Sequence, residues 1–216
     1  MHKIITNLNS IKEELKTKIV DYDKLNIIAV SKTFSLNQIQ PLIDHGHLHY
    51  GENKVQEALE KWSEIKKTNN NIKLHMIEKL QSNKVKFAVK IFDYIHSVDS
   101  EKLAKKIADE QNKIKKKIKV FLQVNIGDEN QKSGVNKKDV VNLVSYCKEI
   151  GLDLLGLMCI PPVNIKPDRY FEEMDSLNKA HSFKELSMGM SSDFLIAAKN
   201  CSTYLRIGSG IFGERS

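Results

Sequence analysis

Short apolar runs alternate along the chain with segments in which apolar residues recur every three or four positions. The first pattern is typical of buried parallel strands and the second of amphipathic helices. Residues 55–62 show the helical spacing, with Val55, Leu59 and Trp62 on one face together with Ala58, and residues 1–20 show it too. The apolar runs predict eight strands, over residues 26–31, 47–50, 73–77, 94–98, 119–125, 154–158, 185–188 and 204–207.

The order of these elements predicts the fold. Eight strands, each followed by a helix or a short helical turn, indicate a single (β/α)8 TIM barrel with an extra N-terminal helix. Helix start signals agree, because Ser35 and Gln38 form a capping-box pattern and Asn136 precedes another helical segment. An open doubly wound sheet is the alternative, but residues 31–33 lack its usual glycine-rich first turn. Since no linker-like stretch divides the chain, we expect one domain over residues 1–216.

Composition places the chain among ordinary soluble proteins. Apolar residues make up 41% and charged residues 28% of the 216 positions. No apolar run approaches the roughly 20 residues that span a bilayer, and the first residues lack a secretory signal pattern. The three cysteines are widely spaced, which favours reduced thiols in a reducing compartment over a metal site. We therefore expect a cytoplasmic protein with no membrane and no metal partner.

The net charge of +7 is compatible with nucleic-acid binding. However, the excess is nearly all lysine, and its one dense run, residues 112–119, lies where a helix should end. Cations are favoured there by the helix dipole. No aromatic residues interleave with this run, so a solvated surface is the better interpretation. The alternative, a basic nucleic-acid binder, predicts an affinity that falls steeply with salt.

In a parallel barrel the functional groups gather at the C-terminal ends of the strands. Lys32 follows the apolar run at residues 27–30, and its amine can project into the barrel mouth. Partial burial there favours the neutral, nucleophilic amine that Schiff-base chemistry requires. The alternative is a lysine that extends past the strand to solvent. Read in chain order, the other strand ends are Asn53, His75, Ser97, Asn125, Met158, Ser187 and the group Arg206, Gly208 and Ser209.

The last two predicted strands run into turns rich in glycine and serine. The seventh passes Ser187 and Gly189, and the eighth leads into Gly208, Ser209 and Gly210. These two loops form the usual phosphate site of TIM barrels, because glycine lets backbone N–H groups approach an anion. The alternative is that the glycines only make turns. A cofactor-free lysine aldolase acting on a sugar phosphate, which would be colourless, fits the same pattern.

Arg206 is expected inside the barrel. If the eighth strand alternates, Arg206 and Tyr204 point to the interior while Leu205 and Ile207 face the helices. A buried arginine keeps its charge and needs a partner. That partner is either a heteroaromatic nitrogen of a ligand or an acidic side chain such as Glu52, and the sequence leaves both open.

At these residues the chain resembles the pyridoxal phosphate homeostasis protein family, also called the YggS/PROSC family. The resemblance runs over essentially the whole chain, and the ordered set of motifs is far more specific than any one of them. The motifs are IAVSKT (28–33), YGEN (50–53), VQE (55–57), His75, LQSNK (80–84), SVD (97–99), VN (124–125), KSGV (132–135), GLM (156–158), LSMGMS (186–191), RIGS (206–209) and IFG (211–213).

The resemblance implies a fold like the N-terminal barrel of alanine racemase. It also implies that pyridoxal 5'-phosphate (PLP) is held as a Schiff base on Lys32, with Arg206 facing the pyridine nitrogen. The other residues implied in cofactor binding are Ser187, Gly208 and Ser209 at the phosphate, Asn53 in the pocket, and His75, Met158 and Ser191 at its rim.

The chain departs from the family pattern in one loop. Where the family usually has a glycine after H-x-I, this chain has Glu78, and Lys79 follows it. Two larger, charged residues therefore replace a turn after the third strand. This puts the shape of that loop in doubt, and any partner that uses it, but not the cofactor anchors.

The resemblance favours a carrier over an enzyme. A cationic Arg206 opposite the pyridine nitrogen disfavours its protonation and weakens the ring as an electron sink. Alanine racemases take a second catalytic group from a C-terminal domain, and we expect no such domain after Ser216. We therefore expect a monomer that binds PLP and supplies it to apo-enzymes in vitamin B6 homeostasis. The alternative is a weak PLP-dependent racemase or transaminase, which would exchange the α-hydrogen of alanine in a Lys32-dependent way.

Overall fold

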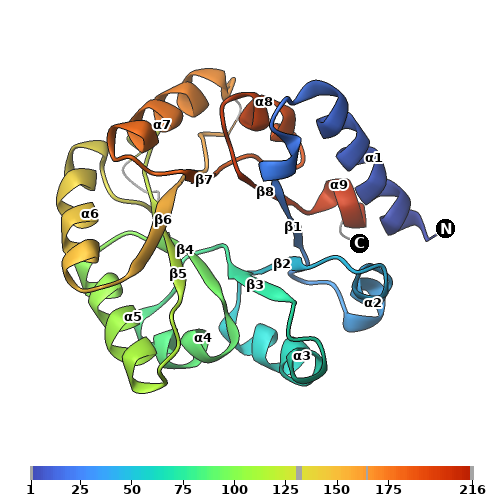
Figure 1. The fold of residues 1–216 in the computed structure, drawn as a ribbon, viewed down its shortest axis with the longest axis horizontal. Coiled ribbons are helices and arrows are strands. Elements are labelled where there is room, and N and C mark those ends of the chain that lie inside the picture. Colours follow the sequence, from blue (N-terminus) through green and yellow to red (C-terminus); the bar gives the residue numbers. More distant parts are fainter. Residues whose placement is uncertain (1, 130–132, 164, 215–216) are drawn as a thin grey trace.

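The computed structural model describes residues 2–129, 133–163 and 165–214. Eight parallel strands pair in chain order and close into a barrel, with β1 bonded to both β2 and β8. Helices surround this barrel (Figure 1), so the predicted TIM barrel is confirmed and the open sheet is excluded. The strands are β1 (Asn26–Val30), β2 (His49–Glu52), β3 (Lys73–Met76), β4 (Tyr94–Val98), β5 (Lys119–Gln123), β6 (Asp153–Met158), β7 (Glu185–Ser187) and β8 (Tyr204–Ile207).

Each strand is followed by helical structure, which covers the outer face of the barrel. None of the helices in the described part of the chain combines the length and apolar character needed to cross a membrane. One domain over residues 1–216 stays a prediction. The α-helices are α1 (Lys3–Lys18), α2 (Leu36–Asp44), α3 (Val55–Thr68), α4 (Val85–Ile91), α5 (Glu101–Lys113), α6 (Val140–Glu149), α7 (Asp168–Ala180), α8 (Phe194–Lys199) and α9 (Ser209–Phe212); the 3-10 helices are η1 (Tyr22–Lys24), η2 (Ser82–Lys84) and η3 (Lys137–Asp139).

The extra N-terminal helix lies where the last strand ends. The apolar stripe of α1 is buried, and α1 lies beside the short helix α9 (Figure 1). Asn7 on α1 donates a hydrogen bond of 2.9 Å to the carbonyl of Ile211 on α9. The first helix therefore supports the turn after β8, where the sequence predicts a phosphate site.

The core has two parts separated by the sheet. The larger part packs the helices against the outward side chains of the strands, including Leu205 and Ile207. A smaller cluster inside the barrel contains Ile28, Phe121 and Tyr204. Strand β8 therefore alternates as predicted, because Tyr204 belongs to the interior and its neighbours to the helix side.

The predicted bounds of the second strand are wrong by two residues. Residues 47–50 were the expected range, but β2 begins at His49 and ends at Glu52. A charged residue normally ends a buried apolar run, whereas the carboxylate of Glu52 is fully buried and hydrogen-bonded. The expected capping box at α2 is present, since Ser35 N–H donates to Gln38 Oε1 at 2.9 Å.

Candidate cofactor site

A cavity of about 580 Å³ opens at the C-terminal ends of the strands. This volume is in the range of small-molecule and cofactor sites. Five of the nine residues that the sequence predicts as cofactor ligands line it: Lys32, Ser191, Arg206, Gly208 and Ser209. The structure therefore brings together the predicted amine, the predicted cation and the predicted phosphate turn.

Lys32 extends from the end of β1 into this cavity. Its ammonium group forms an ion pair with the carboxylate of Glu78, and the exposed fractions of the two side chains are 19% and 41%. The next residue, Thr33, has a φ of 71°, a left-handed conformation that is strained for a β-branched residue. Its N–H donates to Glu57 at 3.0 Å. The sharp turn after Lys32 is thus held by a specific contact, and the lysine does not simply extend into solvent.

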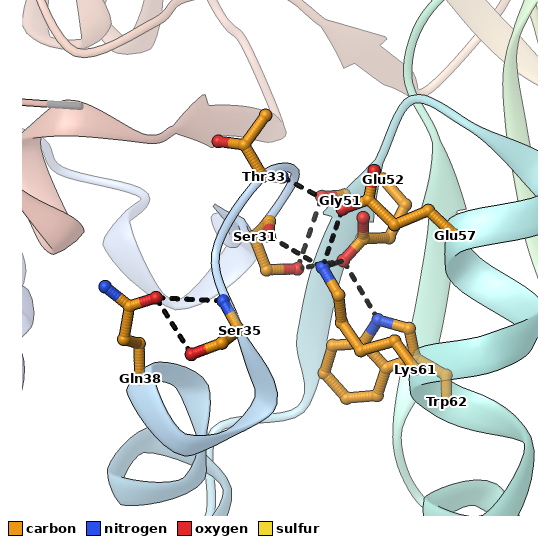
Figure 2. A network of polar contacts seen from close by, with 9 residues as sticks. All are labelled: Ser31, Thr33, Ser35, Gln38, Gly51, Glu52, Glu57, Lys61 and Trp62. Atoms are coloured by element: carbon orange, nitrogen blue, oxygen red, sulfur yellow. Dashed lines mark hydrogen bonds and ion pairs between the residues drawn. The ribbon is translucent and has the colours of Figure 1, made fainter. Parts of the chain in front are cut away.

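A buried cluster around Glu52 fixes the backbone next to Lys32 (Figure 2). Glu52 Oε1 accepts hydrogen bonds from Ser31 Oγ at 2.7 Å, Trp62 Nε1 at 2.9 Å and Lys61 Nζ at 3.0 Å. Lys61 also donates to the carbonyl of Ser31 at 3.0 Å. Because Ser31 directly precedes Lys32, this cluster sets the position from which the lysine side chain starts.

Arg206 lies at the base of the cavity and is 4% exposed. Its guanidinium donates to Ser187 Oγ at 2.6 Å and to the carbonyl of Cys159 at 2.8 Å. Burial lowers its pKa below the ordinary value. The expected alternative, a salt bridge from Arg206 to Glu52, is wrong, because the Glu52 carboxylate is bonded to Lys61, Ser31 and Trp62 instead. Arg206 is thus a buried cation held by neutral oxygen atoms.

The turns after β7 and β8 are joined by Ser191. Its Oγ accepts hydrogen bonds from the N–H groups of Gly208 at 3.2 Å and Gly210 at 3.1 Å. The turn after β7 requires glycine at position 189, where φ is 93° and an added Cβ would lie 2.5 Å from the Cβ of Ala197. Ser191 therefore draws the two loops together at the cavity wall, and its own O–H is the group that can face an anion.

Two buried histidines, His75 and His96, and the partly buried His49 connect the interior of the barrel to Arg206. His49 Nδ1 contacts His75 Nε2, His75 Nδ1 contacts His96 Nε2, and His96 Nδ1 contacts Ser187 Oγ, each at 2.9 Å. Burial lowers the pKa of His49 to about 4 and those of His75 and His96 well below the ordinary value. We call these three residues the histidine column; it is uncharged at neutral pH.

Four predicted cofactor ligands do not line the cavity. Ser187 lies beneath Arg206, and His75 is part of the histidine column. Met158 belongs to the interior apolar cluster. Asn53 lies beside the cavity and donates to Glu78 Oε2 at 3.1 Å. Direct contact of these four with a cofactor stays a prediction. The KSGV motif begins at residue 132, which lies outside the described residues.

The sequence analysis missed His49, His96 and the role of Glu78. The two histidines occupy interior positions of β2 and β4, so the alternation of strand side chains was the signal that could have found them. In the sequence, Glu78 stands out only as a change from the family pattern. Its pairing with Lys32 joins residues 46 positions apart, and no local pattern reveals such a contact.

Comparison with known proteins agrees with this geometry. A family model described as "Alanine racemase, N-terminal domain" matches residues 2–216. The pyridoxal phosphate homeostasis protein of Haemophilus influenzae is 32% identical over 225 residues, which cover 97% of this chain and 95% of that protein. The chain therefore belongs to the alanine racemase N-terminal domain class of barrels. Within that class, it is a member of the pyridoxal phosphate homeostasis protein family.

Solved structures of PipY from Synechococcus elongatus PCC7942 are similar along nearly the whole chain. The structure without PLP has a TM-score of 0.86 and 31% identity, and the one with PLP bound has a TM-score of 0.85 and 30% identity. In both comparisons 97% of this chain and 100% of PipY are covered.

Proposed function

We propose that this protein binds PLP covalently through Lys32 and serves in the homeostasis and supply of that cofactor. The observation that carries the proposal is the convergence of Lys32, Arg206 and the turn at Gly208 and Ser209 on one cavity. The names of the relatives support it, since they are pyridoxal phosphate homeostasis proteins and PipY has been solved with PLP bound.

The donor set of the cavity fits PLP. An aldehyde requires a primary amine, which Lys32 supplies, and a phosphate requires N–H and O–H donors. The hydroxyl-bearing residues Ser191 and Ser209 line the cavity, and the N–H of Gly208, which donates to Ser191 Oγ in this structure, lies at the same turn. Arg206 is a buried cation that donates hydrogen bonds to the neutral oxygen atoms of Ser187 and Cys159, so it can face a ring nitrogen that has a free lone pair.

PLP supplies an electrophilic aldehyde and an electron-withdrawing ring, and the protein determines how far each is used. Lys32 holds the cofactor, while Ser191, Gly208 and Ser209 anchor its phosphate. Arg206 is fixed from behind by Ser187 and the Cys159 carbonyl. A fixed cation near the ring nitrogen opposes protonation there, which weakens the ring as an electron sink. We therefore propose a carrier without catalysis of its own.

The proposed carrier acts as a monomeric cytoplasmic domain that hands PLP to apo-enzymes. Asn53, His75, Met158 and Ser187 take supporting positions around the pocket in this proposal. Nucleic acid and membranes are not among its partners. If the loaded protein restores an apo-enzyme no faster than the same concentration of free PLP does, the handover is excluded.

Covalent attachment is tested by the absorbance spectrum of the protein mixed with PLP. We expect a yellow protein whose chromophore borohydride traps on residue 32, as mapped by peptide mass analysis. Lys32→Ala should lose the trapped adduct completely, because no amine remains at that position. The matched control is Lys54→Ala, which removes an exposed lysine outside the cavity and should leave the adduct unchanged. An adduct on another lysine in the unaltered protein would contradict the proposal.

A further inference from the structure

Glu78 places a carboxylate directly on the nitrogen that reacts. It follows β3 and lines the same cavity as Lys32, and its Oε1 forms the ion pair with Lys32 Nζ. The Glu78 side chain is 41% exposed and that of Lys32 is 19% exposed, so this carboxylate contacts both the lysine nitrogen and the solvent. It is therefore placed to exchange a proton with Nζ.

The second oxygen of Glu78 is also held. Asn53, which follows β2, donates from Nδ2 to Glu78 Oε2 at 3.1 Å. Lys32, which follows β1, pairs with Glu78 Oε1, so each carboxylate oxygen of Glu78 has its own partner. An oriented carboxylate within hydrogen-bond reach of a reacting nitrogen is the geometry that general acid–base catalysis requires. Asn53 therefore acts as a positioning residue for Glu78.

Other carboxylates near the end of β1 are engaged elsewhere. Glu52 and Glu57 both bind Lys61, and Glu57 in addition accepts from the backbone of Thr33. Of the carboxylates that line the cavity, Glu78 is the one that the structure pairs with Lys32.

We infer that Glu78 is the proton-transfer residue for the attachment and release of an aldehyde at Lys32. The inference rests on the proposed function. During attachment, the Glu78 carboxylate takes a proton from the Lys32 ammonium, and the neutral Nζ attacks the aldehyde carbon. The proton returns to the aldehyde oxygen, which takes one further hydrogen from the nitrogen and leaves as water. The third hydrogen of the former ammonium stays on the protonated C=N bond, and Glu78 ends as an ionised carboxylate. Release is the reverse, with water as the co-reactant.

The test compares rates with affinity in Glu78→Gln. This variant keeps the shape of the side chain and its ability to contact Asn53, but it cannot carry the proton. We expect both the loading rate with PLP and the release rate, followed by stopped-flow absorbance, to fall by about 100-fold, the lower end of the range for general acid–base catalysis. The dissociation constant should change by less than about threefold, because a proton-transfer residue acts equally on both directions.

A second variant separates proton transfer from a structural role. Glu78→Gly removes the carboxylate and leaves room beside Lys32 for a small carboxylate from solution. Formate should therefore restore the loading rate in proportion to its concentration, whereas chloride at the same ionic strength should not. The matched charge control is Asp99→Asn, because Asp99 follows β4 at the same end of the barrel and its carboxylate accepts a hydrogen bond from Ser100 at 3.3 Å rather than pairing with Lys32. This control should load and release at the original rates.

The outcomes distinguish this inference from the proposed function. Faster loading by Glu78→Gln would show that the carboxylate only restrains the ammonium and would overturn the inference. Unchanged rates, or rates that formate does not restore in Glu78→Gly, would also overturn it. In each of these cases the borohydride adduct on residue 32 still forms, and the proposed function stands. Loss of that adduct in the unaltered protein would instead remove the proposed function.

Discussion

Two lysine–carboxylate pairs flank the end of β1, and they differ in almost every physical respect. The pair of Lys61 and Glu52 has exposed fractions of 8% and 0%, and Ser31 and Trp62 add hydrogen bonds to the same carboxylate oxygen. The pair of Lys32 and Glu78 is 19% and 41% exposed and lies in the cavity. The first pair supports the backbone, and the second leaves a lysine accessible to a ligand.

The difference shows how one strand end serves stability and chemistry together. Ser31 binds the buried pair, while its neighbour Lys32 belongs to the cavity pair. A buried ion pair is tolerable only when its remaining hydrogen-bonding groups are satisfied, and the Glu52 cluster meets most of that demand. A partly exposed pair contributes little to stability and can be broken when a ligand arrives.

The largest expected effect breaks the buried pair. Glu52→Ala removes the buried carboxylate that Lys61, Trp62 and Ser31 share, and it leaves Lys61 with the more exposed Glu57 as its ion-pair partner, so the free energy of unfolding should fall by about 3–5 kcal/mol. The matched variant Glu78→Ala should cost less than about 1 kcal/mol, because its pair is partly exposed. Urea unfolding followed by circular dichroism measures both. Equal losses in the two variants would show that burial does not separate the pairs.

A smaller effect extends the comparison to Arg206, a buried cation without a carboxylate partner in the described structure. Ser187→Ala removes the acceptor of one guanidinium N–H and the partner of His96. Leaving such buried groups unpaired should lower the free energy of unfolding by about 1–3 kcal/mol. PLP affinity, measured by absorbance titration, should weaken as well, because Arg206 loses its fixed orientation. Unchanged stability and affinity would show that the Cys159 carbonyl suffices to hold Arg206.

The smallest expected effect concerns pH and the column behind Arg206. Unfolded histidines titrate near pH 6.5, whereas burial lowers the pKa of His49 to about 4 and holds those of His75 and His96 well below the ordinary value. Between these values the unfolded chain binds more protons, so the free energy of unfolding falls as the pH falls. Each histidine contributes up to about 1.4 kcal/mol per pH unit.

His49→Gln should therefore reduce this slope by about 1 kcal/mol per pH unit between pH 6 and 4.5. Urea unfolding at a series of pH values gives the slope. The control His45→Gln replaces an exposed histidine and should leave the slope as it is. If His49→Gln leaves the slope as unchanged as this control does, the pKa of His49 is not lowered in the folded protein.

Much of the fold and part of the site could be predicted from the sequence. The alternation of apolar runs and helical segments identifies all eight strands, because buried parallel strands and amphipathic helices have different periods. Lys32, Arg206 and the glycine turns follow from the rule that barrel sites form at the C-terminal strand ends. These are local features, and the structure brings them to one cavity.

The sequence does not reveal contacts between residues that are far apart along the chain. The predicted end of β2 is too early because the sequence alone gives Glu52 the character of a solvent-exposed residue. In the structure Lys61, nine positions later on α3, pairs with its buried carboxylate. In the same way, the sequence marks Glu78 only as a change that puts the shape of the loop after β3 in doubt, whereas in the structure its carboxylate pairs with Lys32. Buried charges depend on partners, and partners are set by tertiary structure.

The histidine column has a consequence for how its protons are arranged. A neutral imidazole carries one N–H, and each contact in the column needs a single hydrogen between its two atoms. If His49 donates to His75, then His75 must donate to His96 and His96 to Ser187; if His49 accepts, every donor is reversed. The three rings therefore share two collective tautomers, and the nitrogen chemical shift of any one ring reports the state of all three.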